Sequence, residues 1–164
     1  MKATCQHLAS LPEEVGPGLD VCPSCIESGG VWVHLRQCLS CGRTGCCDSS
    51  PNRHASGHAA SAGHPVFRSL EDGEDWSWCT VEEATLRRRP DGEWEEVDTF
   101  FEAGLWYAHE AVSGGGAFPP GPDDTTPDGF PIGEWATEYR ARRTAGSIDP
   151  EQAEALEAIP GWSW

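Results

Sequence analysis

Residues 22–64 read CPSCIESGGVWVHLRQCLSCGRTGCCDSSPNRHASGHAASAGH and decide the fold of the first half of the chain. Six of the eight cysteines and four of the six histidines fall in this stretch. Thiolates and imidazoles are the ligands that a borderline-soft, tetrahedral zinc ion prefers. The stretch has too few large apolar side chains to build a core, so bound metal has to replace one. We therefore predict a module held together by zinc.

The ligands of this module can be paired in more than one way. Two Cys-x-x-Cys turns, at 22–25 and 38–41, are separated by twelve residues and could share one ion as a simple zinc ribbon. An interleaved arrangement would use more of the histidines, and spacing alone leaves both open. The full set of candidates is Cys5, His7, Cys22, Cys25, Cys38, Cys41, Cys46, Cys47, His54, His58, His64 and Cys79.

Composition divides the chain in two. The last cysteine is Cys79, and an apolar content of 38% with 19 Gly and 13 Pro is low for one large core among 164 residues. We predict a zinc domain over residues 1–88 and a helical domain over 93–164. The predicted class is α+β, with a small zinc-stabilised antiparallel sheet, short helices and a C-terminal three-helix domain.

Periodicity places the elements. Alternating apolar residues predict strands over 31–35, 66–70 and 76–81, and a short helix is expected over 53–61. From Trp94 to Val112 apolar residues recur every three or four positions, which predicts an amphipathic helix. A second helix contains Trp135 and ends near Gly146. A third begins with Asp149 as N-cap, Pro150 at its first position and Gln152 closing a capping box.

Charge is unevenly distributed. The formal net charge is −16, of which −3 belongs to residues 1–89 and −13 to residues 90–164. Nucleic-acid binding depends on basic groups that release counterions, so the second half is a poor surface for nonspecific duplex binding. The N-terminus lacks the apolar run of a signal peptide, and no stretch reaches membrane-spanning length. We expect a cytoplasmic protein with reduced thiols, and the ten Arg against one Lys suggest a bacterial source.

The order of these motifs resembles the UBP-type zinc finger of ubiquitin-specific proteases and some deacetylases. Over residues 3–85 it runs Cys-x-His, Cys-x-x-Cys, Cys-x-x-Cys, Cys, His, His, then GHP and Trp-Cys. The resemblance implies a small sheet-plus-helix fold with two or three interleaved Zn²⁺ ions. The sets it implies are Cys22, Cys25, Cys46 and His54 for site 1, Cys38, Cys41, His58 and His64 for site 2, and Cys5, His7, Cys79 and Glu82 for site 3. Glu82 stands where three-zinc members have a last cysteine.

The same resemblance indicates which residues would bind a protein partner. Members that bind ubiquitin capture its free C-terminus with an aromatic residue on a strand and an arginine shortly after a metal-binding cysteine. Trp32 matches the aromatic position as a ligand-binding residue, but Asp48 stands where the arginine falls and would repel a carboxylate.

The second half resembles the helicase-associated domain of bacterial proteins, over about residues 93–164. The residues that carry this resemblance are Gly129, Gly133, Trp135, Leu156 and Trp164. The family is thought to contact nucleic acid, and here the basic residues are Arg140, Arg142 and Arg143 on one predicted helix.

Together these patterns predict a non-enzymatic zinc protein that acts as a protein-interaction module, with a protein or peptide as partner and no membrane contact. No catalytic residue is assigned, because a site closed by four protein ligands leaves no position for water. The alternative is a nucleic-acid-associated accessory protein that acts through the helical half. A zinc hydrolase at Cys5, His7 and Cys79 is disfavoured, because no general base is placed nearby.

Overall fold

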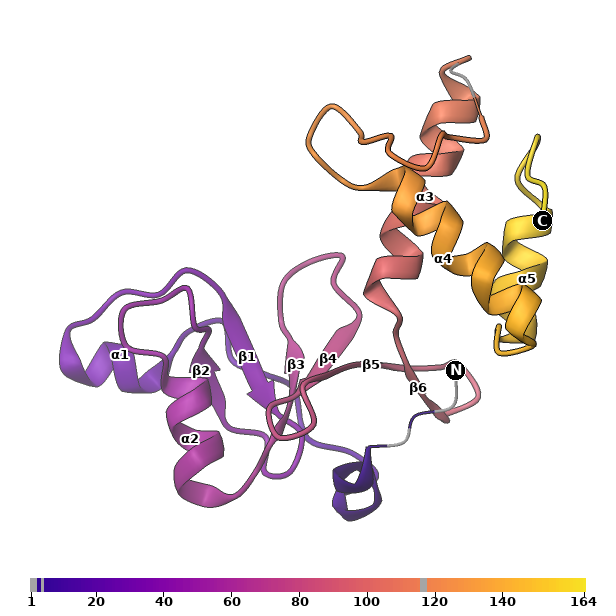
Figure 1. The fold of residues 1–164 in the computed structure, drawn as a ribbon. Coiled ribbons are helices and arrows are strands. Elements are labelled where there is room, and N and C mark those ends of the chain that lie inside the picture. Colours follow the sequence, from indigo (N-terminus) through magenta and orange to yellow (C-terminus); the bar gives the residue numbers. More distant parts are fainter. Residues whose placement is uncertain (1–2, 4, 116–117) are drawn as a thin grey trace. The chain divides into compact units, whose positions relative to one another are not determined.

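The computed structural model describes residues 3, 5–115 and 118–164, and two compact units make up this part of the chain (Figure 1). The first unit ends at Val97, and the second runs from Asp98 to Trp164. None of the helices in the described ranges combines the length and the apolar character that crossing a bilayer requires.

An antiparallel sheet is the scaffold of the first unit. Within the described residues it has six strands in the order β2-β1-β3-β4-β5-β6, so the predicted α+β class is confirmed. Strands β3 and β4 agree with the predictions for 66–70 and 76–81. The strands are β1 (Leu35–Cys38), β2 (Thr44–Cys46), β3 (Val66–Ser69), β4 (Trp76–Cys79), β5 (Ala84–Arg88) and β6 (Trp94–Glu96).

The strand predicted over residues 31–35 is wrong, because β1 begins only at Leu35. Val31 and Val33 are 68% and 55% exposed, so the alternating pattern does not bury one face of a strand. The backbone here forms a loop instead, in which the N–H of Val33 donates to the Ser50 hydroxyl at 3.0 Å. Trp32 packs from this loop onto the cluster that contains Leu35.

Short helices flank the sheet: η1 (Gln6–Ser10), α1 (Pro23–Ser28) and α2 (His54–Ala62). Helix α2 lies directly on strand β2, because Gly45 has no side chain. A Cβ at this position would lie 2.8 Å from the backbone nitrogen of Ala55, closer than Cβ atoms approach other atoms. The buried Ala55 and Ala59 of α2 then pack with Phe67 of β3.

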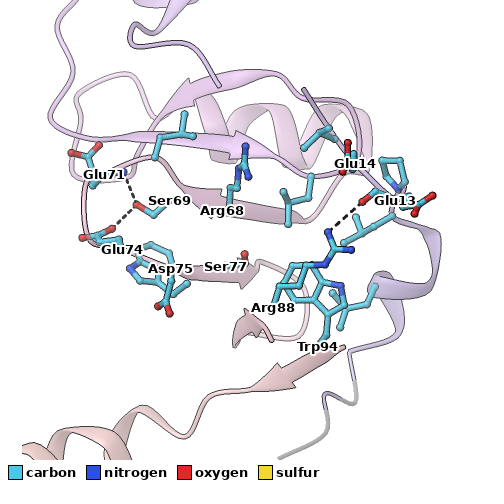
Figure 2. Close-up of a pocket in the computed structure, with 17 residues that line it drawn as sticks. Glu13, Glu14, Arg68, Ser69, Glu71, Glu74, Asp75, Ser77, Arg88 and Trp94 are labelled. Carbon is cyan, nitrogen blue, oxygen red and sulfur yellow. Dashed lines mark hydrogen bonds between the residues drawn. The ribbon is translucent and has the colours of Figure 1, made fainter. Parts of the chain in front are cut away.

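The N-terminal segment runs past the sheet and is tied to it by buried Gln37. The side-chain amide of Gln37 donates to the carbonyl oxygens of Gly16 and Gly42, at 2.9 and 3.0 Å. Between this segment and strands β3 to β5 a cavity of about 750 Å³ remains (Figure 2).

The second unit is helical and has an aromatic core. Its helices are α3 (Thr99–Ser113), α4 (Ile132–Ala145) and α5 (Pro150–Glu157), which confirms the three-helix prediction. Trp135, Tyr139 and Leu156 are completely buried. Gly104 of α3 lets the helices approach, since a Cβ there would lie 2.2 Å from the Trp135 ring.

The predicted start of the first of these helices is wrong. Trp94 belongs to strand β6, where it is paired with Arg88, and the helix begins at Thr99. Asp98 is the N-cap, and its side chain accepts a hydrogen bond from the N–H of Phe101 at 3.0 Å. An N-cap satisfies backbone donors that the first helical turn leaves without partners, so it sets the boundary that apolar spacing alone had missed.

The N-cap of α5 is confirmed, but the capping box is not. The Asp149 side chain accepts from the N–H of Glu151, as an N-cap does. The side chain of Gln152 turns instead toward α3 and donates to Asp98 at 3.3 Å. A tertiary partner, to which Gln152 donates, has therefore replaced the local N–H donor of a capping box.

Candidate metal centres

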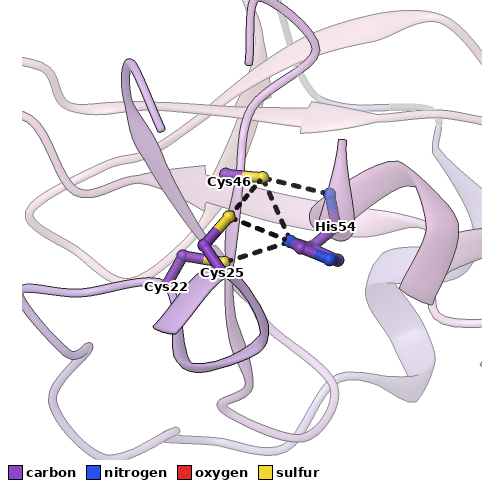
Figure 3. A group of neighbouring side chains, drawn as sticks. All are labelled: Cys22, Cys25, Cys46 and His54. Carbon is purple, nitrogen blue, oxygen red and sulfur yellow. Dashed lines mark hydrogen bonds between the residues drawn. The ribbon is translucent and has the colours of Figure 1, made fainter. Parts of the chain in front are cut away.

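The first group consists of Cys22, Cys25, Cys46 and His54, which lie side by side in Figure 3. Cys22 precedes helix α1 and Cys25 lies within it, so one short helical turn presents two thiols. Cys46 comes from β2, and His54 is the first residue of α2. The contact at Gly45 keeps this strand and this helix together, and so brings the four side chains to one point.

The distances in this group fit one ion. The Nδ1 atom of His54 lies 3.3 Å from the sulfurs of Cys22 and Cys25 and 3.4 Å from that of Cys46. The Cys25 and Cys46 sulfurs are 3.8 Å apart, which is too far for a disulfide. Zinc bonds of about 2.3 Å to sulfur and about 2.0 Å to nitrogen give tetrahedral edges of roughly 3.8 and 3.5 Å. The four donors thus have the spacing of a tetrahedral zinc site.

Two further groups donate hydrogen bonds to these sulfurs, and neither was identified from the sequence. The N–H of His54 lies 3.2 Å from the Cys46 sulfur, and the side-chain amide of Asn52 lies 3.6 Å from that of Cys25. N–H donors of this kind stabilise thiolates and orient them toward a metal. Nothing in the sequence around Asn52 distinguishes it from an ordinary loop residue.

The second group consists of Cys38, Cys41, His58 and His64. Cys38 ends β1, Cys41 follows on a turn, and His58 lies one helical turn after His54 on α2. The Nε2 atom of His58 is 3.3 Å from the Cys41 sulfur and 3.3 Å from Nδ1 of His64. Two imidazole nitrogens and two sulfurs therefore converge, as in a Cys₂His₂ zinc site.

The third group joins the start of the chain to the end of β4: Cys5, His7, Cys79 and Glu82. The Nδ1 atom of His7 lies 4.0 Å from the Cys5 sulfur, 3.6 Å from that of Cys79 and 3.2 Å from Oε1 of Glu82. The same carboxylate oxygen accepts from the backbone N–H of Gln6. Both sulfurs are buried, while Glu82 is exposed.

All twelve residues of the three predicted sets lie in the groups that the family resemblance implied, each group with its ligand atoms within 4.8 Å of one another. The two Cys-x-x-Cys pairs fall in different groups, so the arrangement is the interleaved one and not the simple ribbon. Cys47 lies outside the groups, with its sulfur 3.4 Å from the Ser50 hydroxyl.

Among the grouped thiols, burial raises the pKa of Cys25 to about 11 and that of Cys5 to about 12 in the absence of metal. Zinc binds thiolates, so the ion has to displace protons from these sulfurs. Zinc affinity at both groups is therefore expected to rise with pH.

The two residues connected with ligand capture lie in different surroundings. Trp32 is half-buried against the cluster of Cys22, Cys25, Leu35 and Cys46. Asp48 is exposed, accepts a hydrogen bond from the Ser56 hydroxyl, and lines a cavity of about 600 Å³ together with Trp78 and Glu83.

Comparisons with known proteins agree with this arrangement. Residues 22–90 match the family described as Zn-finger in ubiquitin-hydrolases and other protein, and residues 105–164 match the helicase associated domain. No match was found among curated proteins.

Among solved structures, protein RPA1320 from Rhodopseudomonas palustris, determined by solution NMR, is 39% identical. The match covers 57% of this chain and 89% of that one, with a TM-score of 0.49. The two family matches occur in the order that the sequence motifs predict, with the zinc-finger family in the first half of the chain and the helicase associated domain in the second.

Proposed function

We propose that this chain is a non-enzymatic zinc protein whose first unit is an interaction module for a protein or peptide. The observation that carries the proposal is that each of three ligand groups already contains four protein donors. A structural zinc site is closed by four such ligands, whereas a catalytic site keeps an open position for water. The ions would then shape a surface and take no part in chemistry.

Zinc is the ion that the donors favour. The first group offers three sulfurs and a nitrogen, the second two of each, and the third replaces one sulfur with a carboxylate oxygen. Sulfur and imidazole suit zinc, and oxygen is a weaker partner for a borderline-soft ion than thiolate. We therefore propose three zinc ions, of which the third is bound least tightly.

The cavity beside Asp48 constrains the partner. It is lined by the Trp78 ring and by the carboxylates of Asp48 and Glu83, together with His7. Two carboxylates would repel the terminal carboxylate of a ubiquitin-like tail. A peptide that inserts a neutral or basic side chain beside Trp78 is the better match, because an indole ring also attracts cations.

Native mass spectrometry with metal analysis tests the proposed ions. The parent protein should carry three zinc ions and Glu82→Ala two. The matched control is Glu93→Ala, because Glu93 is an exposed carboxylate on the turn between β5 and β6, outside all three groups. Two ions in both the parent and Glu82→Ala would reject the third site.

A second candidate function is nucleic-acid binding through the helical unit, which the helicase-associated match favours. Its three arginines already have partners: Arg142 pairs with Asp98 and Glu138, Arg143 with Glu157, and Arg140 donates to the carbonyl oxygen of Ser163. Phosphate contacts weaken steeply with salt. A titration of labelled duplex at rising salt should therefore detect little binding even at low ionic strength, and tight, salt-sensitive binding would favour this candidate.

A further inference from the structure

One cavity of the first unit lies apart from the three ligand groups. It has a volume of about 750 Å³ and lies between the N-terminal segment and strands β3 to β5 (Figure 2). Small-molecule sites in proteins have volumes of about 300–1,000 Å³. None of the twelve grouped ligands lines it, so its chemistry can be considered separately from that of the metal.

Arg68 of β3 lines this cavity and is held in position by Gln37. The Gln37 amide nitrogen is already committed to two backbone carbonyls, which fixes its oxygen toward Arg68. That oxygen accepts from Nε of Arg68 at 2.8 Å. A buried glutamine thus orients the guanidinium group at the cost of only one of its five N–H donors.

The remaining donors of Arg68 have no acceptor within the described residues, and its side chain forms no ion pair there. This contrasts with the carboxylates that line the same cavity. Glu71 accepts from the N–H of Leu35, Glu74 from the Ser69 hydroxyl, and Asp75 pairs with Arg87. The cavity therefore contains a fixed cation whose two terminal nitrogens are available to an anion.

Apolar side chains line part of the same cavity. Trp94 of β6 and the side chains of the N-terminal segment form one wall, and the hydroxyl of Ser77 lies on the strand opposite Arg68. The apolar side chains are Leu8, Leu11, Pro12, Val15, Leu39, Leu70, Trp76 and Trp94. These side chains can pack against the hydrophobic body of a ligand, beside the polar groups that orient it.

The acidic residues limit how much negative charge the ligand can carry. Glu71, Glu74 and Asp75 gather near one end of the cavity and Glu13 and Glu14 near the other (Figure 2). Five carboxylates against Arg68 and Arg88 repel polyanions such as phosphate esters and nucleic acids. One carboxylate placed at the guanidinium avoids most of this repulsion and can form two parallel N–H···O bonds.

We propose that this cavity binds a small monocarboxylate with an apolar body, whose carboxylate pairs with Arg68. The body of the ligand lies along the leucines and Trp94, and the acidic ends exclude more highly charged anions. The site does not depend on the proposed partner of the zinc module.

Calorimetric titration of the zinc-loaded full chain tests the proposal, with 4-phenylbutyrate as probe and its neutral amide as control. The acid should bind, and the amide should bind roughly tenfold more weakly or not at all, because it lacks the charge that pairs with Arg68. Arg68→Gln should weaken binding of the acid by a similar factor. Arg43→Gln removes the same charge outside the cavity and should leave the affinity unchanged.

Equal binding of acid and amide, unchanged binding by Arg68→Gln, tighter binding of inorganic phosphate, or no binding of the acid would each overturn the proposal. If Arg68→Gln fails to fold, as judged by its zinc content, the parent protein still provides a test. The NMR signal of the Arg68 Nε–H should shift on titration with the acid and stay in place with the amide.

Discussion

The two units of this chain fill their interiors with different materials. In the first, the completely buried residues include Cys22, Cys25, Cys38, Cys46 and Cys79. In the second they are Ala108, Trp135, Ala136, Tyr139 and Leu156. Apolar burial stabilises the second unit directly, at about 25 cal/mol per Å². Clustered thiols stabilise a fold only when a metal ion binds them. The folding of the first unit should therefore depend on the supply of metal, whereas the folding of the second should not.

The strongest test of this contrast is removal of metal. A tight chelator, or the variant Cys22→Ser, should abolish the tertiary structure of the first unit, because structural zinc supplies about 10–16 kcal/mol in zinc-finger peptides. The helices of the second unit should persist. Two-dimensional NMR resolves the two sets of signals, and a first unit that stays folded in chelator would contradict the proposed role of zinc. Cys47→Ser is the control, since Cys47 lies outside the groups.

The reverse experiment is Trp135→Ala. This indole is completely buried and packs against Phe101 and Tyr139. Its removal should therefore lower the free energy of unfolding of the second unit by about 3–5 kcal/mol. Urea unfolding followed by circular dichroism measures the loss, and metal analysis should find the zinc content unchanged. Trp106→Ala is the matched control, because Trp106 is 58% exposed. Loss of zinc from Trp135→Ala would show that the two units do not fold independently.

A smaller effect that distinguishes the two units is the dependence of the second unit's stability on pH. Burial alone would raise the pKa of Asp98, but hydrogen bonds from Phe101, Tyr139, Gln152 and Arg142 outweigh it and lower the pKa from its ordinary value. A carboxyl with a lowered pKa in the folded state stabilises above its unfolded pKa and loses this contribution as pH falls through the folded value. The second unit should therefore lose stability in acid below about pH 4.

Asp98→Asn should lower the free energy of unfolding of the second unit by about 1–3 kcal/mol at neutral pH. It should also make that free energy less dependent on pH in acid. Thermal unfolding between pH 3 and pH 7 measures both quantities. The control is Asp123→Asn, since Asp123 lies on the exposed loop before α4. An unchanged pH profile in Asp98→Asn would show that other carboxyl groups determine the acid sensitivity.

The ligand groups could be predicted from the sequence because few residue types bind zinc and their order is distinctive. Residue spacing by itself left the pairing open, and the family resemblance was needed to choose the interleaved sets. What could not be predicted were the donors around the sulfurs, such as Asn52. Hydrogen bonds between residues distant in sequence leave no local pattern.

The errors in the secondary structure predicted from the sequence have a common physical origin. Val31 and Val33 alternate as a strand would, yet both point to solvent. Trp94 continues the helical spacing of α3, yet it pairs in the sheet. Gln152 stands where a capping box closes, yet its side-chain amide donates to Asp98, the N-cap of another helix. In each case a contact made across the fold outweighed a local preference.

The absence of a side chain at Gly45 has a consequence for metal exchange at two of the proposed zinc sites. Helix α2 carries His54 of the first group and His58 of the second, and it touches β2 at this position with no side chain between them. Even the methyl group of an alanine here would collide with the backbone of Ala55 and push helix α2 away from strand β2. Both imidazoles would be displaced together, so a single added carbon atom should accelerate zinc release from both proposed sites at once.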